Sequence, residues 1–368
     1  MLIIDGDCPM RGAVMWQRDL TLPIEEVRSA EPLSPRVSLG GQPPDSGTMA
    51  SLPEMRRGQV AAAVVKIGGC ILRPGNPHGD VRTDELAYAA GRGQLGYYRI
   101  LEARGEARLL RSRGDFSDHM KTWSEATEYD DLPVGMVLGM EGADSITWPQ
   151  QVHEWFEAGL RVISLSHHGV SRYSHGTGTG TDGGLMDGAE ELLREMDSLG
   201  MILDVTHTSD ESVRQELDIF EGPVLASHQN CRAVVPGERQ FHDHQLKRII
   251  ERGAVIGHSM DNHMLWKTGL DWANLPEEPP FTKEDVTLDD YVDHIDHVCQ
   301  LAGNSLHSAI GGDTDGQGGT VNAPLEIDTV ADYQKVADVM ERRGYKQEDI
   351  ENVMYRNWQR FFETWLPA

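Results

Sequence analysis

The sequence predicts a (β/α)8 barrel with a metal site at one mouth and extra helices at the C-terminal end. Short apolar runs alternate with helical patterns along most of the chain, which is typical of βα units in a parallel sheet. The length of 368 residues suits one elaborated barrel. Eight runs are expected as strands, over residues 2–4, 60–67, 133–140, 160–165, 201–206, 223–227, 253–257 and 307–312.

Helical patterns separate most of these strands. The spacing of apolar residues predicts helices over 83–106, 149–158, 187–199, 209–219, 243–252 and 287–302. Two more helices, over 329–343 and 347–365, follow the last strand. Residues 17–59 are rich in Pro, Ser and Gly, so we expect a long loop insertion with little regular structure. No repeat or linker divides the chain, which predicts a single domain over 1–368.

The composition limits the class of protein. A formal net charge of −26 argues against nucleic-acid binding, which needs clustered Lys and Arg. The four cysteines (Cys8, Cys70, Cys231 and Cys299) form no CxxC pair and are expected as free thiols in a reducing compartment. No apolar run reaches the roughly 18 residues of a membrane-spanning helix. We therefore expect a cytoplasmic protein with a small-molecule substrate and no nucleic-acid or membrane partner; the sequence leaves a homodimer open.

Four of the expected strands end directly at a polar residue. These residues are Glu141, His207, His228 and Asp313. Because the strands of a barrel deliver side chains to one mouth, the four side chains should lie close together. Two imidazoles and two carboxylates suit a divalent transition metal. A single histidine at such a place would more often be a hydrogen-bonded structural residue, but the equivalent positions of all four favour metal ligation.

Asp5 and Asp7 stand at the end of the first expected strand. Their i, i+2 spacing sends both carboxylates to the same face, so that one strand could give two ligands to one metal. The alternative is a structural Asx turn, with Gly6 between the two aspartates and Pro9 after them. The four polar residues at the other strand ends favour ligation.

Further polar residues follow other strands. One of the adjacent His167 and His168 could face the mouth, although an exposed loop position is the alternative. Arg239, in the loop after the sixth strand, suits capture of a carboxylate, and a solvated surface position is its alternative. His258 ends the seventh strand and could join the site or only pack. The Gly-rich stretch 176–184 lacks the Gly-Lys-Ser/Thr of a phosphate loop, so we interpret it as a flexible active-site loop.

Several segments together resemble the membrane (renal) dipeptidase family of zinc peptidases, a branch of the amidohydrolase-like barrels. The matching segments run in the order of the family and cover nearly the whole chain. They are Gly139-Met-Glu141-Gly142, Leu165-Ser166-His167, Gly184-Leu185-Met-Asp-Gly188, Leu203-Asp204-Val-Thr-His207, Pro223-Val-Leu-Ala-Ser-His228, the stretch from Arg239 to Asp243, Gly311-Gly-Asp313-Thr-Asp315-Gly316 and Arg343-Gly-Tyr-Lys-Gln-Glu-Asp-Ile350.

The resemblance implies a role for each candidate residue. Glu141 would bridge two metal ions, and His207 and His228 would complete the second one. Asp313 would shuttle the proton during hydrolysis. The remaining roles are polarisation of the scissile carbonyl by His167 and capture of the substrate carboxylate by Arg239.

The first strand departs from the pattern of the family, which has His-x-Asp followed two residues later by Pro. Here the segment is Asp5-Gly6-Asp7-Cys8-Pro9. Aligned on Asp7 and Pro9, Asp5 takes the place of the histidine; aligned on Asp5-Gly6, Pro9 takes the place of the aspartate and cannot ligate. We prefer the first alignment because it keeps Asp7 as a ligand. Either way the first metal site loses an imidazole.

We therefore expect a metal-dependent hydrolase that cleaves dipeptides or related small amides, with a hydroxide shared by two divalent ions. Zinc is expected at the site of His207 and His228, and the first site is expected to be weak or to hold another metal. One alternative is hydrolysis of another small amide, ester or lactone. The other is a non-catalytic relative with a degenerate first site, against which the retained Asp313 and Arg239 argue.

Overall fold

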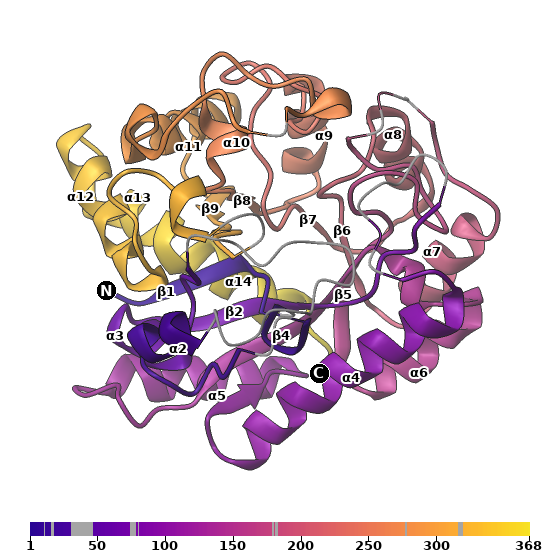
Figure 1. Ribbon diagram of the computed structural model, residues 1–368, viewed down its shortest axis with the longest axis horizontal. Helices are drawn as coiled ribbons and strands as arrows, with labels where there is room; N and C mark the ends of the chain where they lie inside the picture. The colour runs from indigo at the N-terminus through magenta and orange to yellow at the C-terminus, as the bar shows by residue number, and fades with distance from the viewer. Residues whose placement is uncertain are drawn as a thin grey trace.

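The computed structural model describes residues 1–10, 12–15, 18–30, 47–73, 79, 81–178, 180, 183–276, 278–315 and 319–368. In these residues parallel strands curl around a central interior, and helices cover the outer side of the strands (Figure 1). The part of the predicted loop over residues 31–46 lies outside the described residues, as do positions 179, 181 and 182 of the Gly-rich stretch.

Most of the strands form one parallel sheet in the order β1-β2-β4-β5-β6-β7, and β8 pairs with β9 in a second parallel sheet. The bounds are β1 Ile3–Cys8, β2 Val60–Ile67, β4 Val134–Glu141, β5 Leu160–Ser164, β6 Ile202–Asp204, β7 Val224–Leu225, β8 Ile256–His258 and β9 Ser308–Ile310. These eight strands correspond to the eight predicted ones.

The backbone connects the two sheets at both seams. Ala226, directly after β7, bridges Ile256 of β8 in parallel register. On the other side, the backbone N–H of Asp313, shortly after β9, donates to the carbonyl of Asp7 in β1 at 2.9 Å. The predicted parallel barrel is therefore confirmed.

A ninth strand among the described residues, β3 (Ala107–Leu109), was not predicted. It pairs with the first half of β4, where Ala107 opposes Val134, whereas β5 pairs with the second half, where Leu138 opposes Leu160. The two short strands thus share one edge of β4. Three residues are too few for a strand pattern to be visible in the sequence.

Each predicted helical range contains a helix. The α-helices are α1 Gly12–Met15, α2 Ile24–Ala30, α3 Leu52–Arg57, α4 Asp84–Ala103, α5 Arg113–Glu125, α6 Val152–Glu157, α7 Ala189–Ser198, α8 Asp210–Ile219, α9 Asp243–Glu251, α10 Asn262–Leu265, α11 Leu288–Ala302, α12 Gln334–Arg342, α13 Gln347–Glu351 and α14 Asn357–Trp365. Side chains of Thr83, Ser112 and Ser209 cap α4, α5 and α8 by accepting from backbone N–H groups.

The prediction of a loop over residues 17–59 is wrong for two segments, which form α2 and α3. In α2, Ile24 and Val27 lie one turn apart and are both buried. In α3, Ser51 caps the first turn, and Leu52 and Met55 are buried. The Pro-, Ser- and Gly-rich composition of the surrounding residues concealed these short amphipathic helices, whose stability comes from packing against the barrel rather than from propensity.

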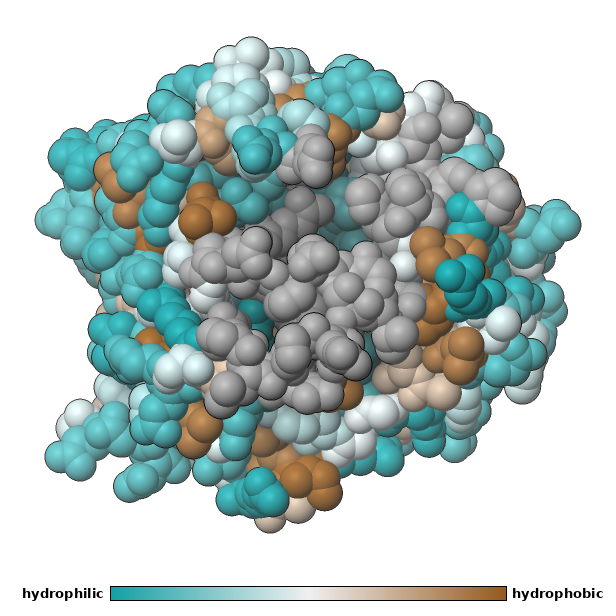
Figure 2. Space-filling model, in the orientation of Figure 1, coloured by the Kyte–Doolittle hydropathy of each residue, from teal (hydrophilic) through white to brown (hydrophobic). Residues whose placement is uncertain are grey.

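The main hydrophobic core extends from Ile3 to Leu366 and includes side chains from every described strand. All four cysteines are thiols rather than disulfides, as predicted. None of the described helices is long and apolar enough to cross a membrane. The described surface in Figure 2 is largely hydrophilic, with hydrophobic side chains scattered among polar ones, which agrees with the strongly acidic composition.

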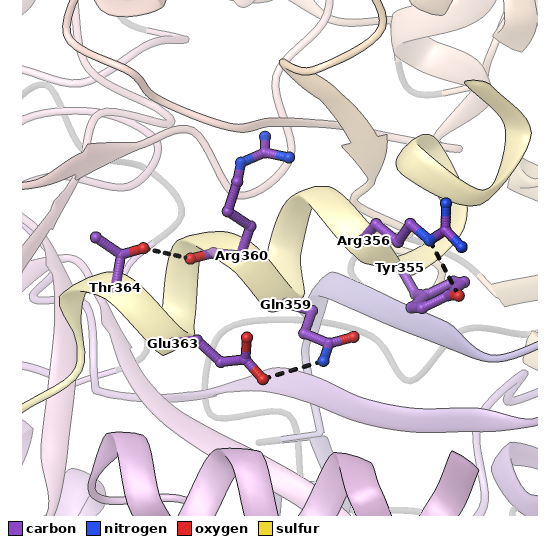
Figure 3. Close-up of a pocket in the computed structure, with 6 residues that line it drawn as sticks. All are labelled: Tyr355, Arg356, Gln359, Arg360, Glu363 and Thr364. Carbon is purple, nitrogen blue, oxygen red and sulfur yellow. Dashed lines mark hydrogen bonds between the residues drawn. The ribbon is translucent and has the colours of Figure 1, made fainter. Parts of the chain in front are cut away.

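A surface pocket lies on the last helical segment (Figure 3). Its lining residues are Tyr355, Arg356, Gln359, Arg360, Glu363 and Thr364. Several of them bond to one another: Gln359 Nε2 donates to Glu363 Oε1 at 3.0 Å, and Arg356 Nε donates to the Tyr355 hydroxyl at 3.2 Å. The pocket contains none of the residues predicted to carry chemistry.

Glu216 is a buried carboxyl group on the inner face of α8. The residue is fully buried, and neither carboxyl oxygen has a hydrogen-bond partner among the described residues. Burial raises the pKa of Glu216 well above its ordinary value, and the negative charge of Asp204 raises it further. The native state therefore favours the protonated form, whereas the unfolded chain ionises at the ordinary glutamate pKa.

We predict that Glu216→Met stabilises the protein increasingly as the pH rises. Above the ordinary glutamate pKa, and up to the raised native one, each pH unit costs the wild type about 1.4 kcal/mol of unfolding free energy. Below the ordinary glutamate pKa, this cost disappears. Urea unfolding at pH 5 and pH 8 measures the effect, with Asp218→Asn, on the exposed side of the same helix, as the control. A variant equally or less stable than the wild type at pH 8 would contradict the prediction.

Candidate metal centre

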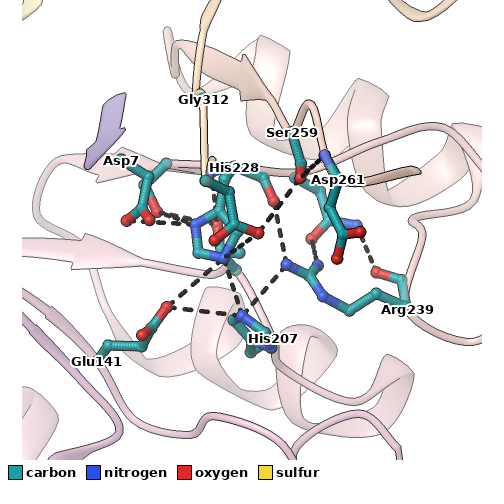
Figure 4. A network of polar contacts seen from close by, with 12 residues as sticks. Asp7, Glu141, His207, His228, Arg239, Ser259, Asp261 and Gly312 are labelled. Atoms are coloured by element: carbon teal, nitrogen blue, oxygen red, sulfur yellow. Dashed lines mark hydrogen bonds and ion pairs between the residues drawn. The ribbon is translucent and has the colours of Figure 1, made fainter. Parts of the chain in front are cut away.

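Three side chains bring their ligand atoms together in the barrel interior (Figure 4). Glu141 is the last residue of β4, and His207 and His228 follow β6 and β7. Each histidine Nε2 lies close to Glu141 Oε1, at 3.6 Å for His207 and 3.5 Å for His228, and the two nitrogens are 2.8 Å apart. Ligands of a tetrahedral zinc ion are about 3.3 Å apart, so this buried group fits a divalent ion.

The backbone is strained at two of the predicted site residues. His207 has φ of 67° and Asp313 has φ of 54°, in the left-handed region that non-glycine residues rarely adopt. The carbonyl of His207 accepts from Thr177 N at 2.8 Å, and Asp313 N is held by the bond to Asp7 across the barrel seam. Strain of this kind persists where the surrounding structure fixes it, and it collects at functional sites.

The two imidazoles differ in their charge preference. Burial lowers the pKa of His207 well below its ordinary value, and the nearby Arg239 guanidinium lowers it further, so His207 is neutral. Burial opposes protonation of His228 too, but the carboxylates of Asp7 and Asp313 outweigh it and raise its pKa. The Nδ1 atom of His228 lies 3.4 Å from Asp7 Oδ1, the arrangement in which a carboxylate orients a ligating histidine.

Asp313 lies beside the group of Glu141, His207 and His228. Its Oδ2 is 3.9 Å from His228 Nε2 and accepts from the Ser259 hydroxyl at 3.3 Å. Burial raises the pKa of Asp313 to about 7; His228 opposes the shift, and the negative charges of Asp7 and other nearby carboxylates add to it. The side chain is 14% exposed, which leaves the carboxyl group open to the interior of the site. A carboxyl group poised in this range can accept and return a proton near neutral pH.

Asp5 occupies a different environment from Asp7. Its Oδ1 accepts from the backbone N–H of Asp7 at 3.0 Å, which is the hydrogen bond of an Asx turn, and from Gly312 N at 2.8 Å. Burial raises the pKa of Asp5 to about 7. Among the described residues, the side-chain groups with the spacing of a metal site include Asp7 but not Asp5. The geometry thus favours the structural alternative for Asp5.

Both histidines that follow β5 lie at the centre. His167 Nε2 is 3.7 Å from Glu141 Oε2, and the His167 ring lies 4.5 Å from that of His207. His168 is also near His207, at 4.6 Å, and stacks on Trp272 with its ring centroid 5.7 Å away. The position of Trp272, from a loop after β8, was not predicted.

Arg239 is buried rather than solvated. Its guanidinium donates to Gln229 Oε1 at 2.9 Å and to the carbonyl of His228 at 3.2 Å, and it faces His207 Nε2 at 3.2 Å. A fixed, buried cation thus lies directly beside the metal-ligand group. His258, by contrast, bonds to structural groups, with Nδ1 3.1 Å from the carbonyl of Gln229.

Sequence reasoning missed Lys66, which lies at the end of β2 and is completely buried. Its ammonium pairs with Asp204 Oδ2 at 2.8 Å and Asp7 Oδ1 at 3.0 Å, and donates to the Ser227 hydroxyl at 3.0 Å. Burial lowers the pKa of Lys66, but Asp204 and Asp7 outweigh it and raise the pKa above its ordinary value. The one signal in the sequence is a single charge within an otherwise apolar strand.

A barrel with histidine and carboxylate side chains converging at its strand ends belongs to the class of metal-binding barrel proteins. The model of one family, described as membrane dipeptidase (Peptidase family M19), matches residues 108–365. The chain therefore belongs to the membrane dipeptidase family.

Curated relatives match part of their own length. An uncharacterized dipeptidase of Schizosaccharomyces pombe is 27% identical over 234 residues, which are 63% of this chain and 53% of the relative. Dipeptidase tcpJ of Claviceps purpurea is 30% identical over 224 residues, 60% of this chain and 48% of the relative. The chain thus aligns with about half the length of these relatives.

Solved structures share the fold over nearly the whole chain. A metallo peptidase from Rhodobacter sphaeroides, liganded with a phosphinate mimic of the dipeptide L-Ala-D-Ala, superposes with a TM-score of 0.75 at 18% identity over 99% of both chains. The probable dipeptidase PvdM from Pseudomonas aeruginosa has a TM-score of 0.74 at 19% identity, over 99% of this chain and 95% of that one. At these identities the likeness concerns the fold alone.

We predict that Gly312→Ala destabilises the protein because Asp5 and Tyr333 leave no room for a methyl group. An added Cβ would lie 2.0 Å from the Tyr333 hydroxyl and 2.9 Å from Asp5 Oδ2, and Tyr333 is itself fully buried. Such overpacking costs about 1–3 kcal/mol. Thermal unfolding measures the loss.

Gly93→Ala is the matched control for this substitution. Gly93 lies within α4, and an added Cβ meets no atom within 4 Å. Alanine there should stabilise the helix by about 0.5–1 kcal/mol. If Gly312→Ala were as stable as the wild type, Gly312 would not be packed against Asp5 and Tyr333 as closely as described.

Proposed function

We propose that the chain is a metal-dependent dipeptidase, which cleaves dipeptides or related small amides. The observation that carries the proposal is the convergence of Glu141, His207 and His228 beside Asp313, a carboxyl group with a raised pKa. Membership of the membrane dipeptidase family gives the reaction class.

Glu141, His207 and His228 would hold a divalent ion. One carboxylate and two imidazoles are a ligand set that suits zinc, and three protein ligands leave one tetrahedral position open. Neutral His207 is already in the protonation state that a ligand needs. When bound, such an ion polarises the carbonyl of the substrate and lowers the pKa of a coordinated water.

Asp313 would move the proton. Its carboxyl group is held by the Ser259 hydroxyl at one oxygen and by the strained backbone at φ of 54°. As a general base it takes a proton from the attacking water, and as a general acid it returns the proton to the leaving amine. A pKa near neutrality serves both directions, because the group is neither always protonated nor always ionised.

His167 and Arg239 would orient the substrate. The His167 ring lies against both Glu141 and His207 and can donate to the carbonyl oxygen of the scissile amide. Arg239 supplies a buried positive charge for the terminal carboxylate of a dipeptide. Since the Arg239 guanidinium is already bonded to Gln229 and His228, its direction is set before substrate binds.

A comparison of substrates tests the proposal. The purified chain is assayed with zinc against a dipeptide library that includes L-Ala-D-Ala, and against acyl-amino acids and lactones in parallel. Hydrolysis of dipeptides that stops with a chelator and returns with zinc is the expected result. Turnover of lactones or acyl-amino acids alone would favour the second hydrolase function, and no turnover of any substrate would favour a non-catalytic relative.

We predict that His228→Ala lowers the zinc content and abolishes dipeptide hydrolysis, because it removes one of two imidazoles from a three-residue ligand group. Elemental analysis and the dipeptide assay measure the two effects. His244→Ala is the control, since His244 is exposed on α9 and should change neither. Full zinc content with near-normal turnover in His228→Ala would show that the ligand assignment is wrong.

We predict that Asp313→Asn keeps the zinc but lowers kcat by roughly 10²–10⁴-fold. Asparagine has nearly the same shape as aspartate, so it can still accept from Ser259, but it cannot carry the proton. Rates are therefore compared per bound zinc ion. Loss of zinc with an unchanged rate per ion would make Asp313 a ligand instead of a proton carrier.

A further inference from the structure

The side chain of Lys66 crosses the barrel interior to groups on the opposite side. From β2 it reaches Asp7 on the neighbouring β1, Asp204 at the end of β6, and Ser227 after β7. Lys66, Asp7 and Asp204 are all completely buried, so solvent does not screen these charges. The ammonium is thus the cation that neutralises the carboxylates in this part of the centre.

The neighbouring strand makes room for the lysine. Lys66 is the register partner of Gly139 in β4. A Cβ at Gly139 would lie 3.2 Å from Lys66 Cδ and 3.7 Å from Cε, tighter than ordinary packing allows at the first of these atoms. A side chain at Gly139 would therefore press on the lysine stem and on Val64, whose Cγ1 would lie 3.0 Å from the added Cβ.

The contacts of Asp7 place a cation beside one oxygen of its carboxylate. Asp7 Oδ1 faces the Lys66 ammonium at 3.0 Å and His228 Nδ1 at 3.4 Å, so a cation and an imidazole already surround that oxygen. A divalent ion bound to the same oxygen would lie on the order of 5 Å or less from the ammonium. In a buried site, two like charges at that distance repel strongly. The Arg239 guanidinium is almost as near to His207 Nε2, at 3.2 Å, but its charge is delocalised, whereas the Lys66 ammonium is a compact point charge.

The other expected ligand of this position is also engaged elsewhere. Asp5 Oδ1 accepts two backbone N–H groups, those of Asp7 and Gly312. The position where the family resemblance implies a first metal ion therefore has no imidazole, one carboxylate in a turn and one carboxylate paired with lysine. The spacing of Asp7, His228 and Asp313 would allow a metal ion, but His228 is shared with the group of Glu141 and His207, and the Lys66 ammonium lies 3.0 Å from Asp7 Oδ1, so the charges do not fit a second divalent ion.

We propose that the Lys66 ammonium takes the place of a metal ion beside Asp7, so that the chain binds one divalent ion, at Glu141, His207 and His228. This inference rests on the proposed function in one respect, the divalent ion at Glu141, His207 and His228. Lys66 is a positioning residue: through Asp7 it fixes the orientation of His228, and it keeps the charge of the centre balanced without a second ion.

The test counts zinc ions on the full chain. The protein is stripped with a chelator, saturated with zinc, freed of unbound zinc and analysed by native mass spectrometry. We expect one zinc per wild-type chain and two per chain of Lys66→Gln, which removes the ammonium and leaves Asp7 and Asp204 without their cation. Lys247→Gln, at an exposed position on α9, is the matched control and should keep one.

Asp5→His separates two explanations for a missing second ion. If the missing imidazole were the cause, this variant would bind two ions with Lys66 still in place. We expect it to bind one, because the ammonium remains. Two tightly bound ions on the wild type, or on Asp5→His, would overturn the proposal.

The number of zinc ions on the wild-type chain is measured without any substitution. This number alone can refute the proposal, even if Lys66→Gln does not fold. Dipeptide hydrolysis is measured on the same samples. One zinc without hydrolysis would refute the dipeptidase function and leave the inference about Lys66 standing. Two zinc ions with hydrolysis would refute the inference alone, and a wild type that binds no zinc would overturn both.

Discussion

The ion pairs of Lys66 are the constraint on which the centre of this barrel depends. They connect side chains from the first strands of the sheet with side chains from β6 and the end of β7, and all three charged residues are buried. Removing one partner of a buried pair leaves an uncompensated charge, which typically costs 3–5 kcal/mol. Without Lys66, Asp204 would still accept from the backbone N–H and the hydroxyl of Ser227, at 3.0 and 2.6 Å, but Asp7 would lose the ion pair that connects it to these two residues.

The ion pairs of Lys66 also position the group of metal ligands. Asp7 is held by Lys66 and in turn faces His228, while Ser227, which accepts from Lys66, lies 2.9 Å from the same imidazole. Lys66 in β2 thus contacts Asp7 and Ser227, and these two residues contact His228 after β7. Arg239 constrains His207 from the other side, so both imidazoles are positioned by buried cations that are not themselves ligands.

The sequence allowed the parallel barrel to be predicted because its strands are apolar runs that end at polar residues. Glu141, His207, His228 and Asp313 could be located for the same reason, since each directly follows such a run. Lys66 could not, because its role appears only when strands far apart in sequence face each other. The sequence offered the turn of Asp5 as an alternative, but the second bond to its carboxylate comes from Gly312, more than 300 residues away. The elements α2, α3 and β3 are too short to show a period.

A lysine that replaces an ion is joined to the protein by covalent bonds and so has no dissociation equilibrium. Its effective concentration at Asp7 does not fall when the supply of metal in the surroundings falls, and dilution cannot remove it. A centre built in this way depends on the external metal pool at one position only. The cost is a loss of exchangeability, because an ammonium group offers neither an open coordination position nor a choice of element.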